Sequence, residues 1–378
     1  MSRDPEDEGY AEALADPMAA LCGGMWATVA VTVAGDAHRA ADGLSEAEVA
    51  AMAAASVAVL SALAGRLSKS LVSMWHAVTS RVARDNRAWA ASQAREVGRA
   101  LDYDPAALVA LYRRRQDAAL MMPLDDLLML DSTGRWRPVG QAYADLVRDS
   151  MRRHPQDPQA VMSEVTRALR ASGGLRIRRP GLTERGRERP SLDVESRVRL
   201  DVVNNVNALT QDIRDETGHQ LGLTSVRVSA HACPAPDHAP YQGRVYTRAE
   251  FDRIQGSLDR PIGAYNCRHI TFPCSDGASP SYSESELRGL ERSGSRPVTL
   301  AVGGGEATRT RYEWTQWMRR QETAARNDRV NAMLMEAAGE SGAADRASAA
   351  RRASMVRAVG GAIGMPADPR RMRVHRLA

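Results

Sequence analysis

The sequence predicts an α+β protein in which helix predominates. Over long stretches the apolar residues recur every three or four positions, which is the period of an amphipathic helix. Only one short stretch alternates like a strand. Alanine is abundant and aromatic residues make up only 4% of the chain, as expected where helices pack closely through small side chains. A chain of 378 residues should form about two compact units with helical extensions.

Residues 1–172 are predicted to form a helical N-terminal region. Between residues 45 and 89, Ser45 and Glu48 form a capping box ahead of a long helix. Two acid–proline pairs mark further helix starts, because an N-cap acid accepts backbone amides and proline lacks the amide that would be orphaned there. The two pairs are Asp104-Pro105 and Asp157-Pro158. The apolar stripe of the long helix consists of Val49, Met52, Ser56, Leu60, Leu63, Leu67, Leu71, Met74, Val78 and Val82.

The segment from Met18 to Gly35 is apolar for nearly the width of a membrane. It contains three glycines and several alanines and threonines, which make it only weakly hydrophobic. We therefore expect a buried helix or strand here and no membrane partner.

Residues 173–190 are predicted to be a linker rich in arginine, glycine and proline, which begins where Gly173-Gly174 ends a helix. A mixed core domain is predicted for residues 191–309. It should open with a helix to about Thr217 and a strand at 225–229, and then become rich in loops over 230–289. A basic helical extension is predicted for residues 310–378, with helices over 310–338 and 343–359.

The formal net charge is +5, and all but one of the 51 basic residues are arginine. A GC-rich genome would produce this bias, and so would a surface that binds DNA, because arginine contacts phosphate in a bidentate way. Two arginine clusters lie in the linker and in the tail, where the alternative is simple solvation. The predicted nucleic-acid contacts are Arg176, Arg178, Arg179, Arg185, Arg187, Arg189, Arg370, Arg371, Arg373 and Arg376.

The four cysteines do not form the pattern of a secreted disulfide framework, so we expect assembly in the cytoplasm. In the loop-rich region, His231, His238, Cys267 and His269 could supply the four ligands of a zinc ion. Their spacing matches no standard zinc finger. The alternative is a set of buried histidines that hydrogen-bond to the loops, and no cofactor is our expectation. Either way, we expect the cluster to hold the loop-rich core together.

An enzymatic interpretation is also open. His231, His238 and Arg268 could serve a nuclease in acid–base catalysis and phosphate stabilisation. The chain has no nucleophile elbow and no His-Glu-x-x-His helix, and Gly303-Gly304-Gly305 lacks the ending of a phosphate loop. We therefore expect a protein that is not an enzyme, with no catalytic residues and no small-molecule substrate.

Three blocks in order carry a resemblance to a known family. They are Val228-Ser229-Ala230-His231-Ala232, then Pro236-Asp237-His238-Ala239-Pro240-Tyr241-Gln242-Gly243, then Asn266-Cys267-Arg268-His269. Together they resemble the phage minor capsid protein 2 family, and the resemblance covers roughly the last 200 residues. This chain departs from the family pattern at Cys233-Pro234-Ala235, where the family usually has a small residue and an arginine.

The resemblance implies a structural minor capsid protein in the head of a tailed bacteriophage, distantly like head-morphogenesis proteins. Its partners would be the portal protein, the major capsid protein or both, and the packaged DNA. Its location would be the virion, in the head or at the portal vertex. Two alternatives remain at this point: the nuclease, and a DNA-binding assembly factor that is absent from the mature virion.

Overall fold

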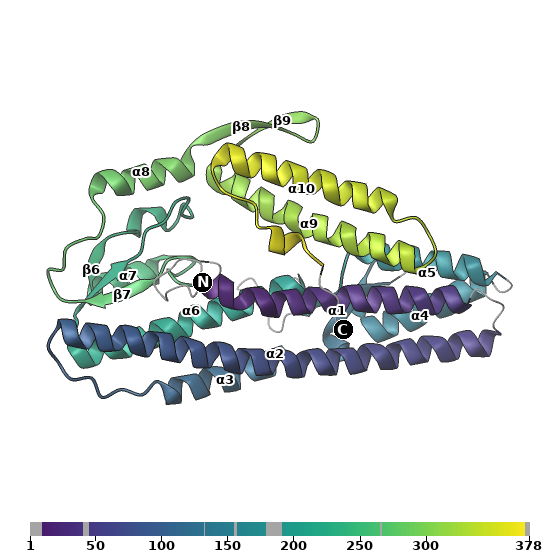
Figure 1. The fold of residues 1–378 in the computed structure, drawn as a ribbon, viewed down its shortest axis with the longest axis horizontal. Coiled ribbons are helices and arrows are strands. Elements are labelled where there is room, and N and C mark those ends of the chain that lie inside the picture. Colours follow the sequence, from purple (N-terminus) through teal and green to yellow (C-terminus); the bar gives the residue numbers. More distant parts are fainter. Residues whose placement is uncertain are drawn as a thin grey trace. The chain divides into compact units, whose positions relative to one another are not determined.

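The structure is a computed structural model that describes residues 10–40, 45–131, 133–154, 157–178, 191–264 and 267–374. Helices dominate these residues and the strands form small sheets, which confirms the predicted fold class (Figure 1). The α-helices of the described ranges are α1 (Tyr10–Ala40), α2 (Glu46–Glu96), α3 (Ala106–Leu120), α4 (Val139–Arg153), α5 (Pro158–Ser172), α6 (Val194–Leu221), α7 (Arg248–Ser257), α8 (Glu284–Ser295), α9 (Arg311–Ala337) and α10 (Ala343–Ile363).

The strands of the described residues pair only antiparallel. One sheet has the order β2-β1-β3-β4, another β6-β5-β7, and β8 and β9 form a hairpin. Their bounds are β1 (Leu127–Leu130), β2 (Trp136–Pro138), β3 (Arg176–Ile177), β4 (Leu192–Asp193), β5 (Ser225–Val228), β6 (Val245–Thr247), β7 (Thr271–Cys274), β8 (Pro297–Val302) and β9 (Gly305–Thr310).

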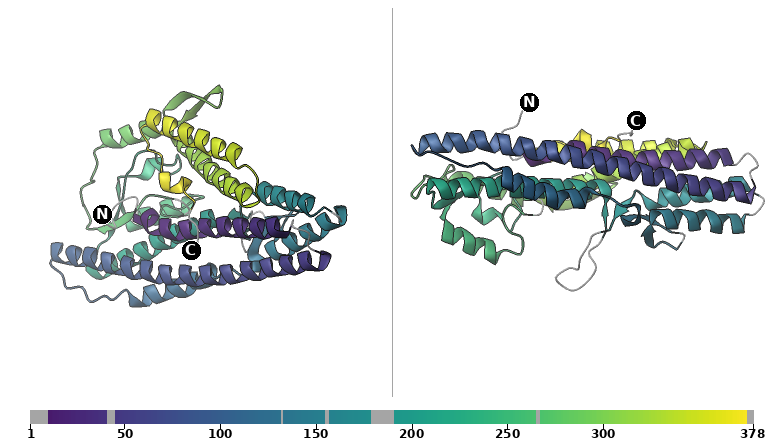
Figure 2. Two further views of the ribbon diagram at one scale, coloured as in Figure 1. Left: turned by 45° about the vertical axis from the view of Figure 1, so that its right-hand side comes forward. Right: turned by 90° about the horizontal axis from the view of Figure 1, so that it is seen from below.

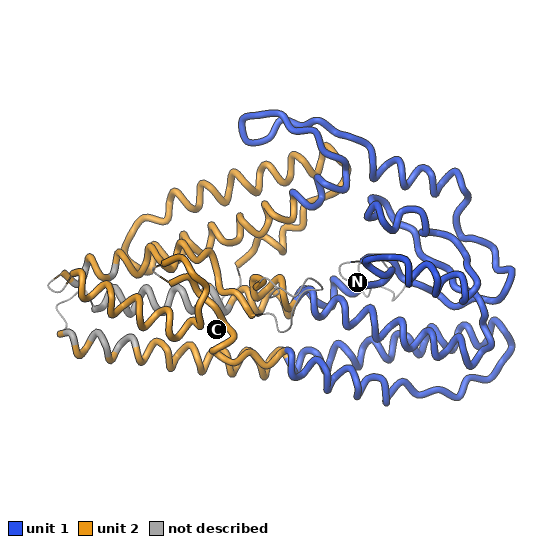
Figure 3. Tube along the Cα trace, turned by 180° about the vertical axis from the view of Figure 1, so that it is seen from behind, with its two compact units in different colours: residues 1–16, 72–119, 199–317 blue, residues 17–71, 120–198, 318–378 orange. Residues whose placement is uncertain are grey.

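The chain divides into two compact units, each assembled from three segments that are far apart in the sequence (Figure 3). Unit 1 comprises Met1–Asp16, Val72–Ala119 and Arg199–Trp317, and unit 2 comprises Pro17–Leu71, Leu120–Val198 and Met318–Ala378. Four long helices, α1, α2, α6 and α9, contribute residues to both units. The sequence analysis divides the chain differently, into four consecutive segments. That division stays a prediction.

The helix starts predicted from capping residues are confirmed. The Ser45 side chain and Glu48 bond each other and each other's backbone amides just before α2. Asp104 Oδ1 accepts the amide of Ala106 at 3.1 Å, and Asp157 Oδ1 accepts that of Ala160 at 2.9 Å. Gly173 ends α5 with φ = 60°, a left-handed conformation that costs glycine little.

The predicted core stripes are buried along most of their length. In α2 the stripe is buried from Ser56 to Leu71 and again at Val78 and Val82, although Trp75 takes the central place expected for Met74. The apolar residues along one face of α6 are all buried: Val194, Val198, Val202, Val206, Leu209 and Ile213. The apolar segment from Met18 lies in helix α1. Part of α2, Ala54–Glu96, is long and apolar enough to cross a membrane by length and composition, a criterion that core helices also meet.

The loop-rich segment 230–289 contains more regular structure than the sequence analysis expected. Strand β6, helix α7, strand β7 and the start of α8 lie within it. Both helices begin with capping boxes, Thr247 with Glu250 and Ser283 with Glu286. They are short and have only one or two buried residues each, so their apolar period is weak while their starts are well marked.

Unit 2 combines a small sheet with helical layers. Helices α4 and α5 pack on each other and on β1. Helices α9 and α10 lie side by side and antiparallel (Figure 2). Asp328 of α9 accepts hydrogen bonds from Ser348 at 2.7 Å and from Arg352 at 2.9 Å, both of α10. Small side chains such as Ala325 and Ala353 fill the contact, as the alanine-rich composition predicts.

Candidate functional site

The candidate site lies in unit 1, beside the sheet β6-β5-β7. Strand β5 leads into His231, and the chain returns through His238 at the start of a short 3-10 helix, Ala239–Tyr241. Cys267 and His269 come just before β7, which pairs with β5. The pairing continues past the strand end, where the Ser229 amide donates to the Ile270 carbonyl at 2.8 Å. Sheet register thus brings two loops together although their residues are about 30 positions apart.

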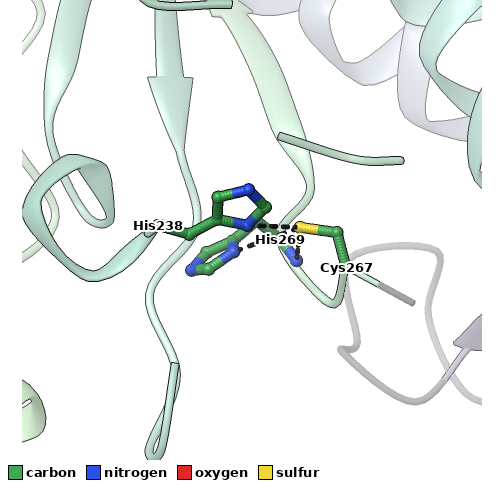
Figure 4. Close-up of side chains that lie close together, drawn as sticks. All are labelled: His238, Cys267 and His269. Carbon is green, nitrogen blue, oxygen red and sulfur yellow. Dashed lines mark hydrogen bonds between the residues drawn. The ribbon is translucent and has the colours of Figure 1, made fainter. Parts of the chain in front are cut away.

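Three side chains converge on one point, as Figure 4 shows. Cys267 Sγ lies 3.3 Å from His238 Nδ1 and 3.3 Å from His269 Nδ1. All three residues are buried, with exposed fractions of 5%, 1% and 2%. Cys267 also belongs to the apolar core formed with Val226 and Phe251, so the cluster is built into the interior of the sheet region.

The remaining histidine supports this group from one side. The rings of His231 and His269 have centroids 4.4 Å apart and planes tilted by 37°. His231 Nδ1 lies 3.0 Å from the carbonyl oxygen of Ala232. All four residues of the predicted cluster are therefore close together, but His231 stands outside the set whose ligand atoms converge.

Gln242 contacts two of the histidines and helps to orient the cluster. Its Oε1 accepts the backbone amide of His231 at 3.1 Å and lies 3.4 Å from His269 Nε2. Its amide nitrogen is buried with no hydrogen-bond partner among the described residues. Gly243 follows with φ = 70°, and a Cβ there would lie 2.3 Å from Leu287 Cδ2. The Gln-Gly pair of the family pattern thus has a physical basis in this fold.

Burial sets the protonation of the cluster. It lowers the pKa of His269 to about 2, helped by the neighbouring His231 and His238. Burial also lowers the pKa of His231, and it raises the pKa of the Cys267 thiol. At neutral pH the His231 and His269 rings are neutral, and a protein interior favours neutral groups over isolated charges.

An ion pair next to His238 was not predicted from the sequence. Arg260 binds both carboxylate oxygens of Asp237, with its NH2 group 2.7 Å from Oδ1. The carbonyl oxygen of the same Arg260 lies 2.7 Å from His238 Nε2. Asp237 neighbours His238 in the sequence, so one residue pair fixes both the loop and the ring. No local spacing marks Arg260, which follows helix α7 in the chain.

A cavity of about 620 Å³ adjoins the cluster within unit 1. Cys267 and His269 form part of its wall, together with polar groups of α6 such as Asn207 and Gln211. The Asn207 side chain donates to the Cys267 carbonyl at 3.4 Å. Asn207 therefore both lines the cavity and holds the backbone of the cluster.

The residues of the nuclease interpretation are engaged in other contacts. Arg268 pairs with Glu12, with 3.4 Å between Nε and Oε1. His231 bonds its own loop, and His238 contacts Cys267 and the Arg260 carbonyl. This arrangement favours a structural cluster.

The described members of both arginine clusters lie in unit 2. Arg176 in β3 stacks over the Trp136 ring at 4.9 Å, and Arg370 and Arg371 flank the carboxylate of Asp368. Arg178 and Arg373 are exposed. Asn266 of the third sequence block and the other arginines of the prediction lie outside the described residues: Arg179, Arg185, Arg187, Arg189 and Arg376.

The fold and the site define a helix-rich α+β protein whose loops are joined by a buried histidine–cysteine cluster. Residues 184–358 match the family model described as phage minor capsid protein 2, which confirms the predicted resemblance. The match supports the role of a phage minor capsid protein, located in the virion and structural rather than enzymatic in class. Every residue of the cluster falls within the matched range. Neither the curated proteins nor the solved structures contain a match to the chain.

Proposed function

We propose that this protein is a structural component of the head of a tailed bacteriophage, bound at the portal vertex and in contact with the packaged DNA. The observation that carries the proposal is the family match over residues 184–358. The cluster agrees with it, because its histidines and cysteine are buried and directed at one another. The portal protein, the major capsid protein or both would be the partners, met during assembly in the host cytoplasm.

The proposal is tested first on particles. Quantitative mass spectrometry of purified, DNA-filled virions should detect the protein at low copy. Cross-linking of the same particles should join it to the portal protein. A protein present in empty precursor heads and absent from filled virions would instead be an assembly factor, and the proposal would be wrong.

The DNA contact is tested by salt dependence. Each phosphate that an arginine neutralises releases counterions, so the logarithm of the DNA affinity should fall with the logarithm of salt by about 0.9 per contact. Replacing all ten predicted arginines with glutamine should flatten this slope. Arg148→Gln with Arg152→Gln is the matched control, because these two arginines are exposed and lie in α4, outside both clusters. An unchanged slope in the tenfold variant would remove DNA from the proposal.

Cleavage is the remaining discriminating measurement. Purified protein incubated with plasmid and magnesium, manganese or zinc ions should leave the plasmid intact. Nicking that disappears in His231→Gln or Arg268→Gln would favour the nuclease over the structural role.

A further inference from the structure

The histidine–cysteine cluster contains more hydrogen-bond acceptors than its one thiol proton can satisfy. In His238, Nε2 lies 2.7 Å from the Arg260 carbonyl oxygen. A carbonyl can only accept, so Nε2 carries a proton. In the tautomer with its proton on Nε2, Nδ1 presents a bare lone pair to Cys267 Sγ at 3.3 Å.

His269 has the same arrangement. Its Nε2 faces Gln242 Oε1 at 3.4 Å, and that oxygen is identified by the His231 amide that donates to it at 3.1 Å. The ring is therefore protonated on Nε2, and its Nδ1 also presents a bare lone pair to Cys267 Sγ, at 3.3 Å.

A thiol has one proton and can donate to only one of these two nitrogens. The sulfur has no second proton to donate, and it also accepts the His269 backbone amide at 3.4 Å. Without a further ligand, one buried nitrogen would lose its hydrogen bond to water and gain nothing, which costs about 1–3 kcal/mol. A cation at the point of convergence would instead use both lone pairs and the sulfur.

We propose that His238, Cys267 and His269 bind one zinc ion through Nδ1, Sγ and Nδ1. Zinc binds thiolate sulfur at about 2.3 Å and imidazole nitrogen at about 2.0–2.1 Å, so tetrahedral geometry places the sulfur and each nitrogen about 3.5 Å apart. The observed 3.3 Å separations are close to this spacing. Binding displaces the thiol proton to solvent, and water takes the fourth position.

The surroundings supply what a zinc site needs beyond its ligands. Ligating histidines normally donate their second nitrogen to a carbonyl or carboxylate, which fixes the ring. Here the Arg260 carbonyl and Gln242 Oε1 take that place for His238 and His269. The mixture of one soft sulfur and two imidazoles suits zinc better than magnesium or calcium, which prefer oxygen.

The ion would join the loop after β5 to the loop before β7 in unit 1. This inference does not rest on the head location of the protein, because its evidence is the geometry of the cluster alone. Failure of the virion experiments would leave it intact, and its own failure would leave the capsid role intact.

The test uses the full-length protein, stripped with a chelator and dialysed. Elemental analysis after adding zinc and removing the excess should find one zinc per chain. Cobalt(II) added instead should give the visible bands of a tetrahedral site and a near-ultraviolet thiolate-to-cobalt band. The Cys267→Ser variant should lose that band and bind zinc at least tenfold more weakly. Cys274→Ser is the matched control, because its half-buried thiol lies outside the cluster, and it should behave like the parent.

Two results would overturn the proposal. One is less than a tenth of an equivalent of zinc retained by the folded parent protein, together with no cobalt spectrum. The other is a thiolate-to-cobalt band that survives Cys267→Ser and disappears in Cys274→Ser. The cobalt spectrum of the parent keeps the test decisive even where a variant fails to fold.

Discussion

Two groups of buried polar side chains in this molecule offset the cost of burying polar atoms in different ways. In unit 1, the three members of the cluster, His238, Cys267 and His269, are all buried. In unit 2, Arg326 of α9 binds Glu195 of α6, with 2.5 Å between NH1 and Oε2. Its NH2 group also lies 3.3 Å from Asp193 Oδ1. In the metal-free chain, burial keeps the His269 ring and the Cys267 thiol uncharged, whereas the second group keeps its charges by pairing them.

The difference predicts opposite sensitivities. A neutral cluster should depend on accurate backbone geometry, because its hydrogen bonds are short-ranged and directional. A buried ionic group should depend on the presence of every charge, because removing one partner leaves the other desolvated and unpaired.

The largest effect is expected for Arg326→Met. The side chains of Arg326 and Glu195 are each only 7% exposed, so the variant would remove the Arg326 guanidinium from a buried carboxylate. We expect the free energy of unfolding to fall by about 3–5 kcal/mol, measured by chemical denaturation. Adding Glu195→Gln should recover part of the loss.

Arg148→Met is the control for that variant. Arg148 pairs with Asp145 on the surface of α4, and its side chain is 58% exposed. Pairs of this kind contribute about 0.2–1 kcal/mol. If Arg326→Met lowers the free energy of unfolding as little as Arg148→Met does, the buried ion pair of unit 2 does not depend on the presence of every charge.

The second effect concerns the backbone that places Gln242. Gly243 has φ = 70°, and a Cβ there would meet Leu287 Cδ2 at 2.3 Å and Ala230 Cβ at 3.2 Å. Gly243→Ala should therefore cost about 2–4 kcal/mol, from the left-handed backbone and from overpacking. In thermal denaturation its melting temperature should fall clearly.

Gly256→Ala is the matched control within unit 1. Gly256 lies in helix α7, and a Cβ there would meet nothing within 4 Å. Alanine is the better helix former, so this variant should gain up to about 1 kcal/mol. Equal melting temperatures for the two variants would contradict the claim that the stability of unit 1 depends on accurate backbone geometry.

The two groups also differ in how far the sequence could predict them. Histidine and cysteine are uncommon and stand near one another in the chain, so His231, His238, Cys267 and His269 could be singled out from their spacing and from the family blocks. Asp193 and Arg326 are separated by 133 positions and belong to very common residue types. No local pattern distinguishes them from solvated charges, and only the packing of α9 reveals their role.

The same reasoning applies to the fold. Helices α2, α6, α9 and α10 could be predicted because each repeats a buried or alanine-rich face over many turns. Helix α7 has one buried residue, Phe251, and was missed despite its capping box. Gln242 was noted only as part of a family block, because an amide gives no sign of which donors it will meet in the folded chain.

The smallest effect separates burial from pairing within unit 2. Glu322 of α9 is 3% exposed, and it accepts the backbone amide of Asp368 at 3.1 Å. Burial raises the pKa of this carboxyl. A folded-state pKa above the unfolded value means that its stabilising contribution is present at pH below the unfolded pKa. That contribution is lost as pH rises through the folded pKa.

Glu322→Gln keeps an oxygen acceptor for Asp368 and removes the ionisation. The parent should therefore lose stability relative to this variant as pH rises from about 4 to 7, by about 1.4 kcal/mol for each unit of pKa shift. Melting temperatures measured across this range would show the widening difference, while the exposed Glu340→Gln should follow the parent at every pH. A constant difference between Glu322→Gln and the parent would mean that Glu322 ionises as freely as a surface carboxylate. Burial would then not be what distinguishes Glu322 from Glu195, whose carboxylate is bound by Arg326.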